Sequence, residues 1–244
     1  MRLAVGLEYD GTGYCGWQRQ SGVISIQETL EKALGQVANE RIATVCAGRT
    51  DAGVHAFGQV VHFDTNAVRT SREWVLGANS NLPSDIRALW VKTVADDFSA
   101  RFAATSRKYR YVIYNNMVAP ALLRHRSMWY RYQLDDDLMN QGAKHLLGEH
   151  DFSSFRSSGC QALSTIRKLT KLSVTKSGGL INIDVEANAF LYHMVRNIVG
   201  TLLKVGAGER SPDWVKEVLA KKDRRAGGIT VPACGLYLVK VEYQ

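Results

Sequence analysis

The sequence predicts an α+β protein, because strand patterns and helix patterns occur together in both halves of the chain. Residues 3–9 alternate between inward and outward positions, and a second strand pattern closes the chain at residues 236–243. With 244 residues and 45% hydrophobic content, the chain is long enough to bury a core and is not disordered. We expect two halves that pack together, residues 1–105 and residues 106–244.

The first half is expected to carry two helices among its strands. Ser25 and Glu28 have the spacing of a capping box, and apolar residues at helical spacing follow them, which predicts a helix. Ser71 is a candidate cap for a second helix over residues 72–79. Further strands are expected at residues 42–46, 60–63 and 86–94.

The second half shows the same mixture. Its strands are expected at residues 108–114, 166–174, 180–185 and 236–243, and its helices at residues 135–147 and 192–205. Ser177, Gly178 and Gly179 separate two of these strands and are typical of a hairpin turn. Ser211 followed by Pro212 predicts the start of a further helix, because proline is favoured at the first helical position.

Charge and cysteine content limit the function classes. The net charge of +8 and the pI of about 9.4 favour a polyanionic partner, although charge alone fits an ordinary basic soluble protein equally well. No apolar run reaches the roughly 20 residues that span a bilayer, and no signal-peptide pattern opens the chain. We therefore expect a cytoplasmic protein with no membrane partner. The four cysteines lack any C-x-x-C pair, which disfavours a zinc site or a disulfide framework: Cys15, Cys46, Cys160 and Cys234.

A glycine-rich segment after the first strand raises the possibility of a nucleotide cofactor. Residues 11–16 match G-x-G-x-x-G, but the next helix begins only near Ser25 and no acidic residue ends the next strand. We therefore expect no dinucleotide cofactor. The histidines 55, 62 and 193 match no ligand spacing, so no metal is expected either. The loop is instead expected to present four side chains to RNA, or to be purely structural: Tyr14, Trp17, Gln18 and Arg19.

Asp51 is the strongest candidate for a reactive group. It lies in a turn between two strand patterns, and Gly48 and Gly53 bracket it. Arg49, two residues away, is a candidate to keep a half-buried carboxylate charged. A lone aspartate in a turn is usually only a turn residue, so spacing alone leaves both interpretations open.

Two further residues stand out by their position. Tyr109 shares one face of an expected strand with Tyr111 and Ile113, where a core tyrosine is the common case. Arg196 lies at the start of an apolar helix. An arginine there needs an anionic partner unless its side chain extends along the helix edge into solvent.

Six segments of the chain, which include these residues, occur in the same order as in a known protein family. The chain resembles the tRNA pseudouridine synthases of the TruA family along nearly its whole length. The segments that carry the resemblance are residues 9–18, 25–31, 48–56, 79–83, 107–111 and 190–196. The segment Gly48-Arg49-Thr50-Asp51-Ala52-Gly53-Val54-His55-Ala56 resembles the active-site motif of that family.

The resemblance implies a fold and an activity. The family has two α+β halves around a continuous, mainly antiparallel mixed sheet, with the active cleft between them. It isomerises uridine to pseudouridine at positions 38, 39 and 40 of the tRNA anticodon stem-loop without a cofactor, and it works as a homodimer. Asp51 matches its catalytic aspartate and Tyr109 its active-site tyrosine, which stacks on the target uracil. Arg196 matches the partner of that aspartate, and Arg49 and Arg196 are candidates to hold Asp51 ionised or to contact phosphate.

Two other classes remain open at this point. The first is a non-catalytic basic RNA-binding protein that uses the same basic cleft. Separately, the charged run Lys221-Lys222-Asp223-Arg224-Arg225 is expected to form a solvated basic patch that can contact phosphates. The second is a carboxylate hydrolase such as a glycosidase. That chemistry usually needs two facing carboxyl groups, and no second acid near Asp51 is evident in the sequence.

Overall fold

The computed structural model describes residues 1–244 and divides them into two compact units. Unit 1 comprises residues 1–105 and 237–244, and unit 2 comprises residues 106–236. The sequence places the C-terminal strand in the second half. In the structure this strand, β10 (Leu236–Tyr243), runs parallel to β3 (His55–Asp64) and pairs Tyr237 with His55. Residues 237–244 therefore belong to unit 1.

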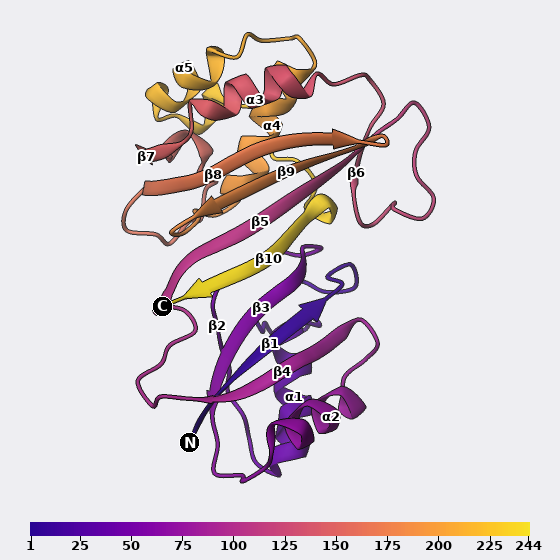
Figure 1. Cartoon of the computed structure of the whole chain (residues 1–244), viewed down its shortest axis with the longest axis vertical. Helices are drawn as coiled ribbons and strands as arrows, with labels where there is room; N and C mark the ends of the chain where they lie inside the picture. The colour runs from indigo at the N-terminus through magenta and orange to yellow at the C-terminus, as the bar shows by residue number, and fades with distance from the viewer. The chain divides into compact units, whose positions relative to one another are not determined.

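The sheet of unit 1 has the strand order β4-β1-β3-β10, with β2 (Val45–Cys46) also paired to β3. Strand β1 (Arg2–Tyr9) lies between β3 and β4 (Ile86–Val94) and runs antiparallel to both (Figure 1). Residues 3–7 are all buried in spite of their alternating pattern, and on one of them, Gly6, the side chain of Trp90 on β4 covers the backbone.

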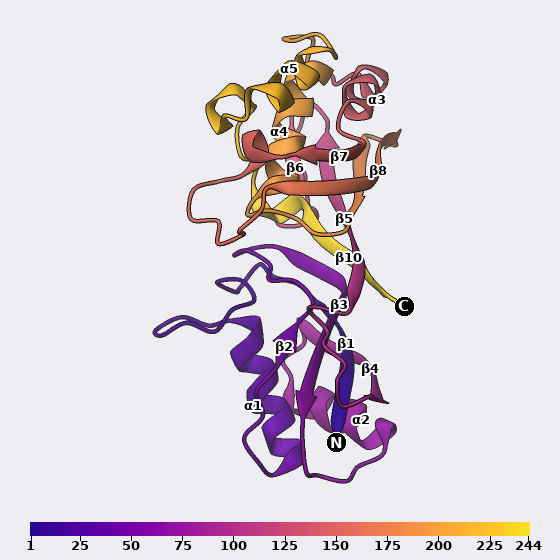
Figure 2. The same ribbon diagram turned by 90° about the vertical axis from the view of Figure 1, so that its left-hand side faces the viewer.

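Two helices pack against each other beside this sheet, α1 (Ile26–Ala38) and α2 (Ser71–Asn81) (Figure 2). The Ser25 hydroxyl caps α1 by accepting from the Glu28 N–H at 3.3 Å, as expected, but the Glu28 carboxylate pairs with Lys32 instead of completing a capping box. The complete capping box is at α2. There Thr70, rather than the expected Ser71, is the cap and exchanges hydrogen bonds with Glu73.

The strand expected at residues 42–46 is much shorter in the structure. Only Val45 and Cys46 pair with β3. The backbone N–H and the hydroxyl of Thr44 both donate to the carboxylate of Glu31 on α1, at 2.8 and 3.1 Å. Because the polar groups of Thr44 donate to Glu31 on α1, Thr44 does not pair with β3, and the strand begins at Val45.

The sheet of unit 2 has the strand order β5-β9-β8-β7, formed by antiparallel pairs, with the short β6 parallel to β5. The hairpin of β8 and β9 turns at Gly178 and Gly179, whose φ angles of 56° and 81° are those of the expected tight turn. The bounds are β5 (Ala104–Asn115), β6 (Met128–Tyr130), β7 (Gly148–Asp151), β8 (Ile166–Ser177) and β9 (Leu180–Ala187).

Three helices accompany this sheet, α3 (Asp136–Lys144), α4 (Met194–Gly206) and α5 (Trp214–Lys221) (Figure 2). Helix α5 begins later than the Ser-Pro signal predicts, because Ser211 accepts from the Trp214 N–H in a turn before the helix. Three short 3-10 segments complete the chain, η1 (Ser153–Phe155), η2 (Arg224–Ala226) and η3 (Ala233–Gly235). The predicted α+β class with mainly antiparallel strands is confirmed. None of the helices has the length and apolar character needed to cross a membrane.

Candidate active site

Asp51 lies in the turn that joins β2 to β3 in unit 1, and its side chain is half-buried. The turn is closed by the Val54 N–H, which donates to the Asp51 carbonyl oxygen at 3.1 Å. Gly53 has a φ of 78°, a left-handed conformation that favours glycine. The chain therefore reverses within a few residues and holds the carboxylate at the end of the sheet.

Buried side chains of the sheet brace the residues just before Asp51. The hydroxyl of Tyr9 on β1 shares a hydrogen bond of 2.8 Å with the Thr50 hydroxyl. The side-chain amide of Gln59 on β3 donates to the Gly48 carbonyl oxygen at 2.7 Å. Both bracing groups come from strands, so the Asp51 turn is tied to the sheet of unit 1.

The segment between β1 and α1 packs its backbone against the same turn. The Trp17 N–H donates to the Thr50 carbonyl oxygen at 2.9 Å, and the Gly53 N–H donates to the Tyr14 carbonyl oxygen at 3.4 Å. A Cβ atom built on Gly16 would lie 2.7 Å from the Thr50 carbonyl oxygen, and one on Gly11 would lie 2.0 Å from that of Val54. The glycine spacing that resembles a dinucleotide motif therefore lets two backbones approach each other.

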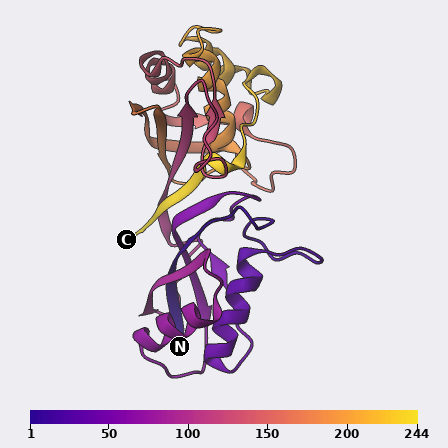
Figure 3. The same cartoon turned by 90° about the vertical axis from the view of Figure 1, so that its right-hand side faces the viewer.

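The expectation that Tyr14 and Trp17 face RNA is wrong. Trp17 is 1% exposed, and the buried Tyr14 donates its hydroxyl to the Asp85 carboxylate at 2.7 Å. Burial, together with that carboxylate, raises the pKa of Tyr14. Beyond Trp17 the segment projects from the rest of unit 1 (Figure 3), and there Arg19 is exposed and pairs with Glu31 at 3.1 Å.

Replacing Gly16 by Ala should destabilise the protein. The left-handed φ of 86° and the close Thr50 carbonyl predict a loss of about 2 kcal/mol in the free energy of unfolding, measured by urea denaturation. The control is Gly13→Ala in the same segment, where no atom lies within 4 Å of a built Cβ and φ is not left-handed. Equal losses in the two variants would show that the contact at Gly16 is not what holds the turn.

Arg49 lies beside Asp51 in sequence, but its side chain is exposed and forms no ion pair or hydrogen bond. Its charge acts instead on the nearby thiol of Cys46. Burial raises the pKa of Cys46 to about 12, a shift that the charge of Arg49 opposes. Cys46 is therefore a neutral thiol and not a competing nucleophile. Arg49 is available to contact a phosphate.

Tyr109 lies on β5 in unit 2, opposite Val185 on β9, and is 8% exposed. Its ring packs edge-to-face on Phe190, with ring centroids 5.0 Å apart. This contact restricts the ring of Tyr109. The sequence pattern gives Phe190 no role, although this residue opens the segment that contains Arg196.

Arg196 lies in the first turn of α4, also in unit 2, and its Nε donates to the Val231 carbonyl oxygen at 2.7 Å. His193 precedes the helix with a φ of 59° and provides no side-chain cap, and the first turn has no acidic residue. The positive end of a helix repels a cation unless an anion lies nearby. The arrangement therefore favours an anionic partner for Arg196.

The three candidate histidines occupy separate environments. The Nδ1 atom of His55 lies 3.1 Å from an Asp10 oxygen, and that of His62 accepts from the Ala100 N–H at 3.0 Å. The Nδ1 atom of His193 lies 3.2 Å from the Ser157 hydroxyl. No group of three or more possible metal-binding side chains gathers in the structure.

Comparison of the sequence with known proteins shows which family the chain is similar to. Residues 7–103 and 143–244 match the sequence model of a family described as tRNA pseudouridine synthase. The chain is 54% identical to tRNA pseudouridine synthase A of Colwellia psychrerythraea, over 100% of this chain and 94% of that protein. It is 56% identical to the protein of that name from Shewanella denitrificans, over 100% and 93%, and 52% identical to that of Coxiella burnetii, over 99% and 93%. The matched ranges include the Asp51 turn, and the second range includes Arg196.

Proposed function

Because this chain belongs to the tRNA pseudouridine synthase family, we propose that it forms pseudouridine at positions 38, 39 and 40 of the tRNA anticodon stem-loop. The chain is an isomerase that converts uridine in tRNA to pseudouridine, as its relatives over the full length indicate. The position in the stem-loop is supported by the six segments that resemble the TruA family. The single observation that carries the proposal is the braced turn of residues 48–56, which combines the motif of the family with a half-buried carboxylate.

The chemistry of the reaction explains why a carboxylate is needed. The N1–C1′ bond of the uridine breaks, the uracil turns, and a C5–C1′ bond forms. C5 loses its proton and N1 gains one, so the reaction is redox-neutral and consumes nothing. Attack on C1′, attack on C6 and removal of a proton on the way to a glycal all require a charged carboxylate. We assign that role to Asp51.

The other candidates act on the substrate in this proposal. The ring of Tyr109, held edge-on by Phe190, stacks on the uracil after the nucleotide has left its helix, a step that costs roughly a few kcal/mol. Arg196 supplies positive charge to Asp51 or to the phosphate of that nucleotide, and the exposed Arg49 contacts the RNA backbone. Support comes from the resemblance and from the surroundings of each residue within its own unit.

The remaining assignments rest on the resemblance alone. We propose that the enzyme acts in the cytoplasm as a homodimer, with tRNA lying across both subunits. The net charge of +8 supports a polyanionic substrate.

Position mapping on unmodified tRNA tests the proposal. Transcripts with uridine at positions 38, 39 and 40 are incubated with the protein, and pseudouridine is located by nucleoside analysis and primer extension. The control transcript has cytidine at all three positions and keeps its other uridines. We expect pseudouridine only in the first set. Pseudouridine in the control would place the target elsewhere in tRNA, and none in either would contradict the function itself.

A further inference from the structure

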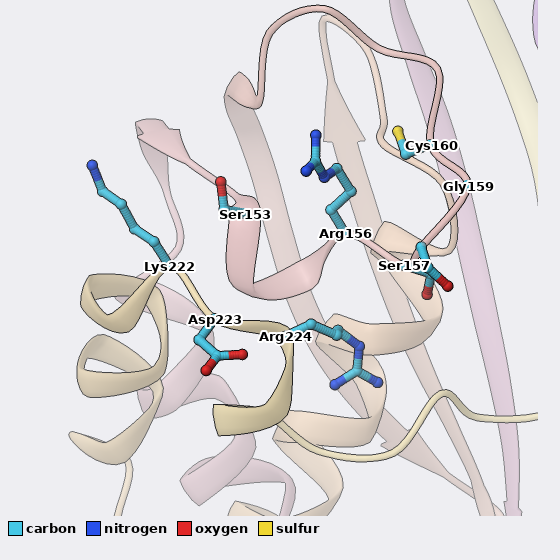
Figure 4. A pocket seen from close by; sticks show the side chains of 9 residues that line it. Ser153, Arg156, Ser157, Gly159, Cys160, Lys222, Asp223 and Arg224 are labelled. Atoms are coloured by element: carbon cyan, nitrogen blue, oxygen red, sulfur yellow. The ribbon is translucent and has the colours of Figure 1, made fainter.

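Unit 2 contains a polar cavity of about 350 Å³ that the candidate active-site residues do not line. The segment that follows η1 and the segment that leads into η2 form its walls (Figure 4). Apart from Asp223, the groups it offers are cationic side chains, hydroxyls and a thiol. The cavity, called here the Arg156 pocket, is lined by Ser153, Arg156, Ser157, Ser158, Gly159, Cys160, Lys222, Asp223 and Arg224.

The acidic groups near the pocket are already neutralised. Asp223, the acid in its lining, pairs with Arg225 at 2.8 Å, and that contact lowers the pKa of its carboxyl group to about 2. Lys222 pairs with Asp151 at 3.3 Å. These four charges balance in pairs, so they leave no net negative charge at the pocket.

The two arginines in the lining have no carboxylate partner. Arg224 donates to the Asn197 side-chain oxygen at 2.9 Å and to the Thr230 hydroxyl at 3.0 Å, both neutral groups. Arg156 is half-buried and its side chain forms no ion pair or hydrogen bond. The pocket therefore has the net charge of two guanidinium groups, in a setting where an arginine usually has a partner.

A further cation, Arg167 on β8, lies near the pocket residue Cys160. Burial lowers the pKa of Arg167, and its buried Nε has no hydrogen-bond partner.

The pocket is also connected to the start of α4. Asn197, which accepts from Arg224, donates to the Ser157 hydroxyl at 3.3 Å and to the Phe155 carbonyl oxygen at 2.7 Å. Asn197 follows Arg196 directly. The expected solvated patch at residues 221–225 is thus not uniform, because Arg224 turns inward to hold this network while Lys221 and Lys222 stay exposed.

We propose that the Arg156 pocket binds a phosphodiester group of the tRNA backbone, an inference that rests on the proposed function. Two planar guanidinium groups without anionic partners, next to serine hydroxyls, match the oxygens of a phosphate. A phosphate there contacts Arg156, whose side chain has no partner in the protein, while Arg224 adds positive charge to the pocket. The contact carries no base information, so it positions the RNA relative to α4 and does not select the sequence.

Arg156→Gln tests the inference, because this side chain has no partner in the protein and its removal leaves the fold intact. We expect the Kd for unmodified tRNA to rise about three- to tenfold, and the slope of log K against log salt concentration to become shallower by about one. Arg156→Lys should restore part of the affinity. The matched control is Lys144→Gln, which removes the same charge from an exposed residue of α3 in the same unit and should change the Kd less than about twofold.

The outcomes separate this inference from the proposed function. Equal Kd values and equal salt slopes for Arg156→Gln and Lys144→Gln would overturn the phosphate assignment. The proposed function would still hold in that case if the wild-type protein forms pseudouridine. A second experiment measures the binding of inorganic phosphate to the wild type and to Arg156→Gln by calorimetry. Binding of inorganic phosphate that is lost in Arg156→Gln, with unchanged tRNA affinity, would assign the pocket to a small phosphate ligand and also overturn the inference. Melting temperatures of the variants confirm that each is folded.

Discussion

Asp51→Asn is expected to lower the single-turnover rate of pseudouridine formation by about a thousandfold or more, while tRNA binding changes little. Asparagine keeps the size and shape of the side chain in its turn but removes the negative charge. The nearby Cys46 thiol cannot replace it, since burial raises the pKa of that thiol to about 12 and it stays neutral. Rates are measured by nucleoside analysis with enzyme in excess over tRNA, and affinity by filter binding.

The matched control for this variant is Asp64→Asn. Asp64 is the last residue of β3, the strand that follows the Asp51 turn, and its carboxylate pairs with Arg2 at 2.8 Å. The control removes one negative charge from the same unit and should leave the rate within about twofold. A retained rate of more than a few per cent in Asp51→Asn would exclude the carboxylate as the catalytic group.

The second large effect is expected from Arg196→Met, which should lower the single-turnover rate about a hundredfold. Methionine keeps much of the side-chain volume but loses the charge at the start of α4, where the helix itself offers no acidic residue. Arg196→Lys should be impaired less, because lysine keeps the charge but lacks the planar fork for two parallel contacts.

Lys204→Met on the last turn of the same helix provides the comparison. It removes an equal charge from α4 at the opposite end, and the rate should stay within about twofold of wild type. Thermal melting of both variants separates lost activity from lost folding. If Arg196→Met and wild type have the same rate across the pH range, Arg196 has no part in the reaction and is a side chain that extends along the helix edge.

The sequence predicts those elements whose signals are local. The strand over residues 86–94 and the closing strand over residues 236–243 match β4 and β10, because both have strand patterns with clear ends. The hairpin at Gly178 and Gly179 is likewise set by two residues that accept a left-handed φ. The sequence predicts the turn that holds Asp51 for the same reason, because the glycines on both sides of this acid are close to it in the sequence.

The features that the sequence does not predict depend on partners far along the chain. The strand before Asp51 shortens because Glu31 of α1 takes the polar groups of Thr44. Trp17 is buried rather than exposed because its backbone joins the Thr50 carbonyl, a contact across many residues. The pairing of β10 with β3 and the inward turn of Arg224 toward Asn197 have the same origin.

Tritium release from tRNA labelled at C5 of uridine distinguishes an isomerase from a protein that only binds tRNA. The C5–C1′ bond of pseudouridine replaces the C5–H bond, so each isomerisation transfers one tritium to water. We expect the wild-type protein to release tritium without any added cofactor, one tritium for each pseudouridine found at positions 38, 39 and 40. Tight, salt-dependent binding of the same tRNA with no tritium released would contradict this expectation and would make the chain an RNA-binding protein without catalytic activity.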